Sequence, residues 1–160
     1  MHGIEKKLET LGLRLPPTPV PQGSYIPAVR TGNLVFVSGQ LPMRDGQLIF
    51  KGKVGKDLDV TQAQEAARLC FLNILAALGT AGISPDQVTR VIRLGGFVQS
   101  VDGFTEQPKV INGASDLCRM VFGDAGIHAR AAVGVIALPL DAAVEIEALF
   151  EVGGPNLPRE

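Results

Sequence analysis

Two side chains in the last third of the chain are placed to bind and activate a small polar molecule. Arg130 opens a run of small residues, ARAAVGV, and Glu145 lies in a strand-like run, VEIEALFEV. An arginine with small neighbours keeps its planar fork open for a bidentate carboxylate, although a strand-end arginine usually pairs with a surface carboxylate. A sheltered Glu145 could hold a water and relay its proton, although a row of glutamates on one strand face is ordinarily solvated.

Other residue types that often carry chemistry give weaker indications. His128 stands in the loop before Arg130, where a histidine is more often a solvent contact than a general base. Cys70 and Cys118 fall in apolar runs with no second Cys or His at metal-ligand spacing, so we expect buried free thiols in a reducing compartment. No zinc motif, Ser-His-Asp order or phosphate-binding pattern is visible, and Gly95-Gly96 indicates a β-bulge. We expect no metal site.

The composition predicts one domain with small-molecule partners. The chain has 160 residues, 15 basic and 16 acidic, with a formal net charge of -1. This balance gives no electrostatic footprint for a polyanion, so we expect no nucleic-acid partner. The N-terminus has no continuous apolar block, and the longest uncharged apolar run, 69–85, is shorter than the ~20 residues of a membrane span. We expect a soluble, cytoplasmic protein with no membrane partner.

The chain divides into an N-terminal extension at 1–22, a domain at 23–152 and a C-terminal tail at 153–160. Apolar residues three or four apart predict a short helix over 4–11, and prolines at 16, 17, 19 and 21 predict an extended connector. The domain begins with strands at 28–31 and 34–38 around the tight turn Gly32-Asn33, and a third short strand is expected over 47–51.

The remainder of the domain alternates helices with strands. Thr61 and Gln64 form a capping-box pattern at the start of a helix that ends near residue 78. Strands follow at 88–99, 130–136 and 144–152, and a second helix is expected over 105–122, although Gly113 in its middle costs about 1 kcal/mol relative to Ala.

The order β-β-β-α-β-α-β-β predicts an α+β domain in which two helices cover one face of a mixed sheet. Neither face of strand 130–136 is properly polar, since Ala131, Val133 and Val135 alternate with Arg130 and small residues. A face that bears small residues and an arginine needs a cover, and with both helices used we expect that cover to be another copy of the chain. A site at the interface of an oligomer follows.

Two distant segments carry a resemblance to a known family. Residues 23–42 read GSYIPAVRTGNLVFVSGQLP, and residues 129–152 read ARAAVGVIALPLDAAVEIEALFEV. Together they resemble the Rid (RidA/YjgF) family, also called the L-PSP endoribonucleases, over nearly the whole domain. The resemblance implies a chorismate-mutase-like sheet of about six strands, a homotrimer and a pocket between subunits.

The resemblance also implies roles for particular residues. In that family an arginine at this position binds the substrate carboxylate and a glutamate at this position helps to place the attacking water, which are Arg130 and Glu145 here. Tyr25 matches the pocket tyrosine. The likeness further implies a polar floor and one more contact, which are Ser38, Gly39 and Asn112.

Family members with these residues hydrolyse reactive 2-imino or enamine acids to 2-oxo acids and ammonia without a metal or organic cofactor. The resemblance therefore implies a small carboxylate metabolite as substrate, with a non-catalytic metabolite-binding trimer and a ribonuclease as alternatives. This chain departs from the family pattern at Ser24, Ile26-Pro27, Ile127-His128 and Gly134. With its N-terminal extension it resembles a divergent subgroup.

Overall fold

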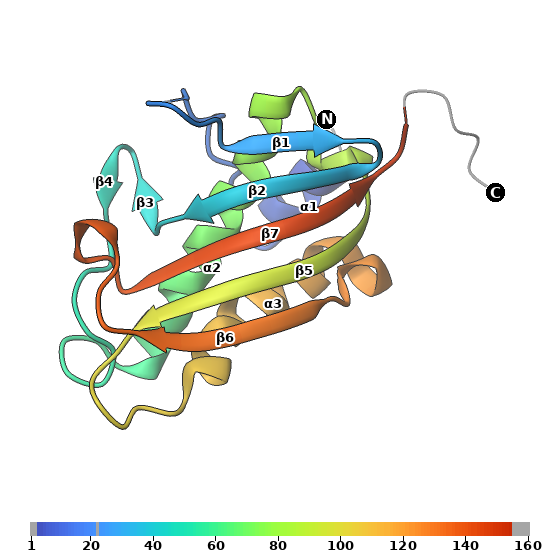
Figure 1. Ribbon diagram of the computed structural model, residues 1–160. Helices are drawn as coiled ribbons and strands as arrows, with labels where there is room; N and C mark the ends of the chain where they lie inside the picture. Colours follow the sequence, from blue (N-terminus) through green and yellow to red (C-terminus); the bar gives the residue numbers. More distant parts are fainter. Residues whose placement is uncertain (1–2, 22, 155–160) are drawn as a thin grey trace.

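The fold is a five-stranded mixed sheet with helices on one face (Figure 1). The computed structural model describes residues 3–21 and 23–154. The strand order is β1-β2-β7-β5-β6, in which β5 and β6 are parallel and the other neighbours antiparallel. The strands are β1 Ala28–Thr31, β2 Leu34–Gln40, β5 Val88–Gln99, β6 Ala129–Val135 and β7 Val144–Val152.

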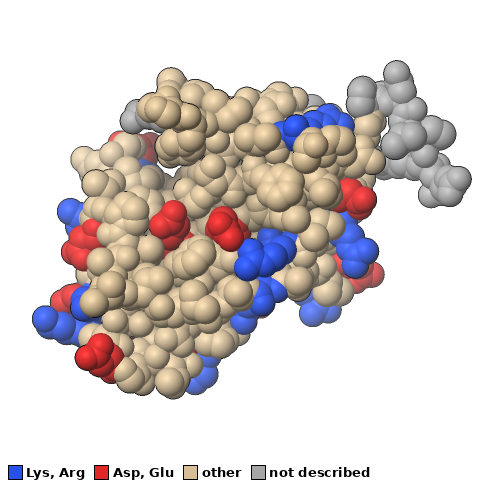
Figure 2. All heavy atoms as spheres, in the orientation of Figure 1, with Lys and Arg blue, Asp and Glu red and all other residues tan. Residues whose placement is uncertain are grey.

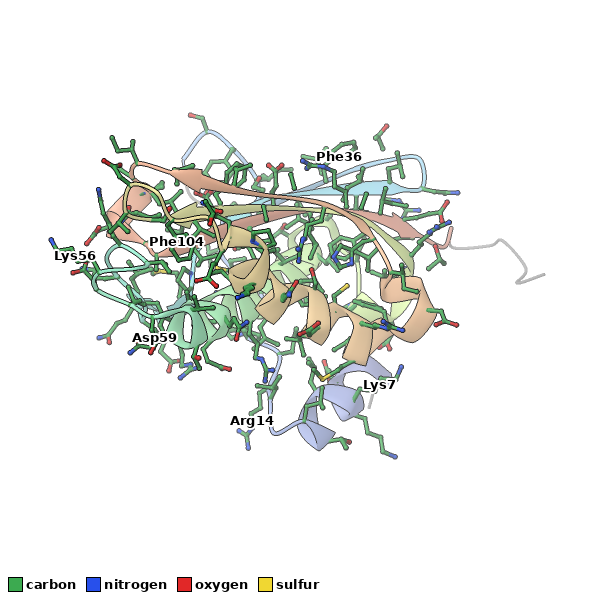
Figure 3. The ribbon with its side chains drawn as sticks, turned by 90° about the horizontal axis from the view of Figure 1, so that it is seen from below. Lys7, Arg14, Phe36, Lys56, Asp59 and Phe104 are labelled. Carbon is green, nitrogen blue, oxygen red and sulfur yellow. The ribbon has the colours of Figure 1, made fainter. Side chains whose placement is uncertain are left out.

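Two long helices, α2 (Val60–Ala77) and α3 (Gln107–Phe122), cover one face of this sheet, which confirms the predicted α+β architecture (Figure 3). The short α1 (Gly3–Thr10) packs against α3 on the side away from the sheet. Its Ile4 and Leu8 are buried in the same core as the domain, and Lys7 Nζ donates to the carbonyl of Val121 over 2.9 Å. The N-terminal segment is therefore part of the packed domain.

The expected third strand of the sheet is absent from it. The chain instead forms a separate hairpin from β3 (Met43–Arg44) and β4 (Gln47–Leu48), so the described sheet has five strands and not about six. Asp45 and Gly46, with φ of 51° and 75°, close a turn so tight that the short strands pair with each other. Among the described residues, four 3₁₀ turns complete the regular structure: Leu78–Ala81, Pro85–Gln87, Gly123–Gly126 and Pro139–Asp141.

Two local predictions were wrong. The capping box of α2 is formed by Asp59, which accepts from the backbone N–H of Gln62 at 2.8 Å, and not by Thr61. Figure 3 labels Asp59. Asp59 has extended backbone, as an N-cap requires, and Gln62 is three residues further on. The pair Gly95-Gly96 forms no bulge, because its register with β6 and β7 is continuous, and the shifts in β5 lie before Arg93.

The core fills the space between the sheet and the helices. Even-numbered residues of β7 are buried against α2 and α3, as the alternation predicted. Cys70 and Cys118 are both buried free thiols, which confirms that prediction.

None of the described helices combines the length and apolarity needed to cross a membrane. Residues 1, 2 and 22 of the extension and 155–160 of the tail lie outside the described residues.

The other face of the sheet has no cover within the described chain. Apolar side chains are exposed on it, with 49% of Val29, 49% of Phe36 and 45% of Val133 accessible. Figure 2 views this face and shows a largely uncharged surface with a few acidic and basic groups near its centre, and Figure 3 shows Phe36 pointing away from the helices. Such an apolar surface is typical of a protein interface. We refer to it below as the open face.

Candidate functional site

Glu145 lies on the open face at a bulge in the neighbouring strand. Val37 of β2 pairs with Ala148 of β7, but Gln40 pairs with Ile146, so Ser38 and Gly39 form an irregular step between them. A Cβ on Gly39 would stand 2.0 Å from Oε1 of Glu145, which means that the carboxylate occupies the space over this glycine. Partial burial raises the pKa of Glu145 above its ordinary value, and the charge of Glu147 raises this pKa further.

The predicted tyrosine and serine belong to the same region of the chain. The backbone N–H of Ser38 donates to the carbonyl of Pro27 at 2.8 Å, and its hydroxyl lies 3.4 Å from the carbonyl of Ile26. These contacts tie the segment that carries Tyr25, which is 61% exposed, to the bulge in β2. We call Tyr25, Ser38, Gly39 and Glu145 the glutamate half-site.

Arg130 has different surroundings. Its Nη1 donates to Oδ1 of Asn112 at 2.8 Å and to Oγ of Ser115 at 3.1 Å, both on α3. Within the described chain, its Nε and Nη2 have no hydrogen-bond partner. A depression of about 260 Å³ lies here, lined by Ser115, Asp116, Arg119, Gly126, Ile127, His128 and Arg130. We call Arg130, Asn112, Ser115 and His128 the arginine half-site.

The two half-sites lie on opposite faces of the sheet. Arg130 is in register with Leu94 of β5, and Glu145 is in register with Phe97. Residues 94 and 97 are three apart in a strand of continuous register, so their side chains point to opposite sides. The prediction that the face bearing Arg130 needs a second copy as cover was wrong, because that face is turned toward α3 and the uncovered face is the one that bears Glu145.

The sequence did not identify Ser115 as part of the arginine half-site, and His128 was expected to be a solvent contact. Ser115 lies one helical turn after Asn112, so both reach the same side of α3. The Nε2 atom of His128 lies 2.9 Å from Oγ of Ser115, and Nδ1 lies 2.6 Å from the carbonyl oxygen of Gly126. The spacing of Asn112 and Ser115 in a helix could have indicated the serine.

In the described chain, no group of three or more His, Cys, Asp and Glu side chains gathers as a metal site would require.

The two half-sites are suited to different chemistry, one to binding an anion and the other to transferring a proton. The arginine half-site offers guanidinium donors to an anion, as a carboxylate receptor does. The glutamate half-site offers a carboxylate whose raised pKa suits it to accept a proton from water and return it. Each half-site is incomplete by itself for a reaction on a carboxylic acid.

Comparisons with known proteins extend over the whole domain. Residues 5–151 match the family described as "YjgF/chorismate_mutase-like, putative endoribonuclease". The chain is 45% identical over 150 residues to Protein TCP17 of Trypanosoma cruzi, covering 93% of this chain and 94% of that protein. It is 31% identical over 139 residues to the "2-iminobutanoate/2-iminopropanoate deaminase" of Dermatophagoides farinae, covering 86% and 92% of the two chains.

A solved structure agrees with this similarity. The crystal structure of Atu1372 from Agrobacterium tumefaciens, a protein of unknown function, matches with a TM-score of 0.88 and 49% identity, covering 94% of this chain and 93% of that one. The range matched to the family includes both half-sites.

Proposed function

The chain belongs to the YjgF/chorismate-mutase-like family, and from that premise we propose that it hydrolyses reactive 2-imino or enamine acids to 2-oxo acids and ammonia. The observation that carries the proposal is that one domain bears both an anion receptor, at Arg130, and a carboxylate of raised pKa, at Glu145. The mite relative, named for deamination of 2-iminobutanoate and 2-iminopropanoate, supports the same class of substrate.

We further propose that the reaction takes place between copies of the chain in a homotrimer. Arg130 and Glu145 point to opposite sides of one sheet, so a substrate in contact with both requires the two residues to come from neighbouring subunits. The open face, with Val29, Phe36 and Val133 partly accessible, supplies apolar surface for such an interface. The pocket would then join the glutamate half-site of one subunit to the arginine half-site of its neighbour.

The proposed reaction consumes one water and releases one ammonia for each imine. The Nε and Nη2 atoms of Arg130 bind the substrate carboxylate, which fixes the imine carbon relative to Glu145. Glu145 accepts a proton from the attacking water as oxygen bonds to that carbon and passes it to the imine nitrogen. It then passes the remaining hydroxyl proton to the same nitrogen as the C–N bond of the tetrahedral intermediate breaks and the C=O bond forms, so that ammonia leaves. Its raised pKa suits both transfers, since the carboxyl must gain and lose the proton in one cycle.

The experiment generates imines in situ with an amino-acid oxidase and lets semicarbazide compete for them. We expect the parent protein to remove the trappable imine faster than water alone, and Arg130→Gln and Glu145→Gln each to lose about a hundredfold or more of this activity. Arg14→Gln is the matched control, because Arg14 carries the same charge and is exposed outside both half-sites. It should retain the parent rate.

Two outcomes would contradict parts of the proposal. A parent protein that sediments as a monomer would contradict the intersubunit pocket. An oligomeric parent that accelerates no imine, yet binds 2-oxobutanoate through Arg130, would instead identify a non-catalytic carboxylate-binding protein.

A further inference from the structure

A chain of hydrogen bonds leads from the backbone to the guanidinium of Arg130. The Nδ1 atom of His128 lies 2.6 Å from the carbonyl oxygen of Gly126, and Nε2 lies 2.9 Å from Oγ of Ser115. Nη1 of Arg130 then donates to this Oγ at 3.1 Å. Ser115 and His128 are both only partly buried, so they are not ordinary core residues.

The direction of each bond follows from the groups involved. A carbonyl oxygen can only accept, so Nδ1 of His128 carries the proton that donates to Gly126. In the neutral ring Nε2 is then an acceptor, and it takes the single hydroxyl proton of Ser115. The oxygen of Ser115 is left with its lone pairs toward Arg130, which needs an acceptor there.

One edge of the Arg130 guanidinium has no hydrogen-bond acceptor within the described chain. Nη1 has two N–H groups, and Asn112 and Ser115 accept one each. Of the five guanidinium donors, the N–H of Nε and the two of Nη2 have no partner within the described chain. Nε and Nη2 lie side by side, and they match the two oxygens of a carboxylate.

We propose that Ser115 and His128 are positioning residues that hold Arg130 with its Nε–Nη2 edge toward the substrate carboxylate. This inference rests on the proposed function for the identity of the ligand. His128 acts through Ser115 and has no part in proton transfer to the substrate. Without the His128 acceptor the Ser115 hydroxyl can turn its proton toward Arg130, and without Ser115 one N–H of Nη1 loses its acceptor and the guanidinium can rotate.

The test measures binding of 2-oxobutanoate to the parent and five variants by isothermal titration. Ser115→Ala and His128→Asn should each weaken binding about tenfold, equivalent to about 1.4 kcal/mol. Asn reaches only as far as the ring position that contacts Gly126. The conservative variants Ser115→Thr and His128→Gln should stay within about twofold of the parent, because the hydroxyl is kept in one and an amide oxygen can replace Nε2 in the other. Arg130→Gln should weaken binding at least a hundredfold.

Sedimentation and thermal unfolding of every variant verify that assembly and fold are kept. If Ser115→Ala and His128→Asn bind as the parent does while Arg130→Gln does not, the positioning role is wrong and the proposed function stands. Equal losses in His128→Gln and His128→Asn would also overturn the proposed hydrogen-bond chain. If the parent binds no 2-oxobutanoate, or binds it equally well without Arg130, both proposals fail.

Discussion

Substituting alanine at Gly39 should remove activity while leaving the fold intact. Gly39 does not have a positive φ, so alanine meets no backbone strain there. Its new Cβ would stand 2.0 Å from Oε1, 2.8 Å from Cδ and 3.1 Å from Cγ of Glu145. All three atoms belong to one flexible side chain, so Glu145 can turn away while the strands keep their places.

The size of the effect follows from these distances. Ordinary van der Waals contact begins at 3.4 Å, so Oε1 of Glu145 has to move by more than about 1 Å. A displacement of about 1 Å of a group that positions the reaction costs on the order of a hundredfold in rate. The stability should change by less than about 1 kcal/mol, because no backbone atom is displaced.

Gly95→Ala is the matched control for this substitution. It lies on the same face, and its Cβ would stand 2.6 Å from Oε1 of Glu147, so it displaces the neighbouring glutamate instead. In the imine-trapping assay Gly39→Ala should lose about a hundredfold and Gly95→Ala should lose less than about fivefold. Full activity in Gly39→Ala, or an equal loss in both variants, would refute the assignment of the water-activating role to Glu145.

Three further predictions concern stability, each measured by urea unfolding at fixed protomer concentration. The raised pKa of Glu145 means that the folded state binds this proton more tightly than the unfolded state does. The stability difference between the parent and Glu145→Gln should therefore stay constant below the ordinary pKa of 4.5, and the parent should lose stability relative to the variant as the pH rises above that value; a difference that does not change with pH would contradict the burial argument. Leu8→Ala should cost about 2–5 kcal/mol because Leu8 is fully buried, whereas an exposed appendage would tolerate it. Gly113→Ala should destabilise by about 1–3 kcal/mol despite alanine's better helix propensity, because its Cβ would stand 2.1 Å from the backbone oxygen of Gln64; a more stable variant would mean that α2 and α3 can separate.

Features set by local chemistry were predictable from the sequence. The turn at Gly32-Asn33, with φ of 58° at the glycine, joins β1, which has the expected bounds, to β2, which begins at the expected residue 34 and continues two residues beyond the expected 38. The alternation of β7 identified its buried and exposed sides, and the helix predicted from about 61 to 78 is α2 at 60–77. Each of these depends on residues close in the sequence, whose spacing directly reports backbone geometry.

Features that depend on distant pairing were not predictable in this way. Gly113 is a poor choice by helix propensity, and only the approach of α3 to the backbone of Gln64 explains why a glycine stands there. The residues at 47–51 have no special signal that distinguishes a sheet strand from a separate hairpin. The pair Gly95-Gly96 looked like a bulge, but in the structure the space beside Gly95 is filled by Glu147 and the space beside Gly96 by Ile111. Close packing, and not backbone irregularity, explains these glycines.

The placement of Arg130 and Glu145 on opposite faces of the sheet is the clearest feature that the sequence could not predict. Alternation tells which residues of one strand share a side, but it does not tell which side of the sheet that is. Arg130 and Glu145 are close in sequence, yet β5 runs between their two strands, and its register turns them to opposite faces. Loss of either Arg130 or Glu145 should therefore be complemented when the two variants are mixed and allowed to exchange subunits, because some pockets would regain both residues. Mixed Arg130→Gln and Glu145→Gln subunits with no recovered activity, despite demonstrated exchange, would mean that the reaction does not use one residue from each of two copies.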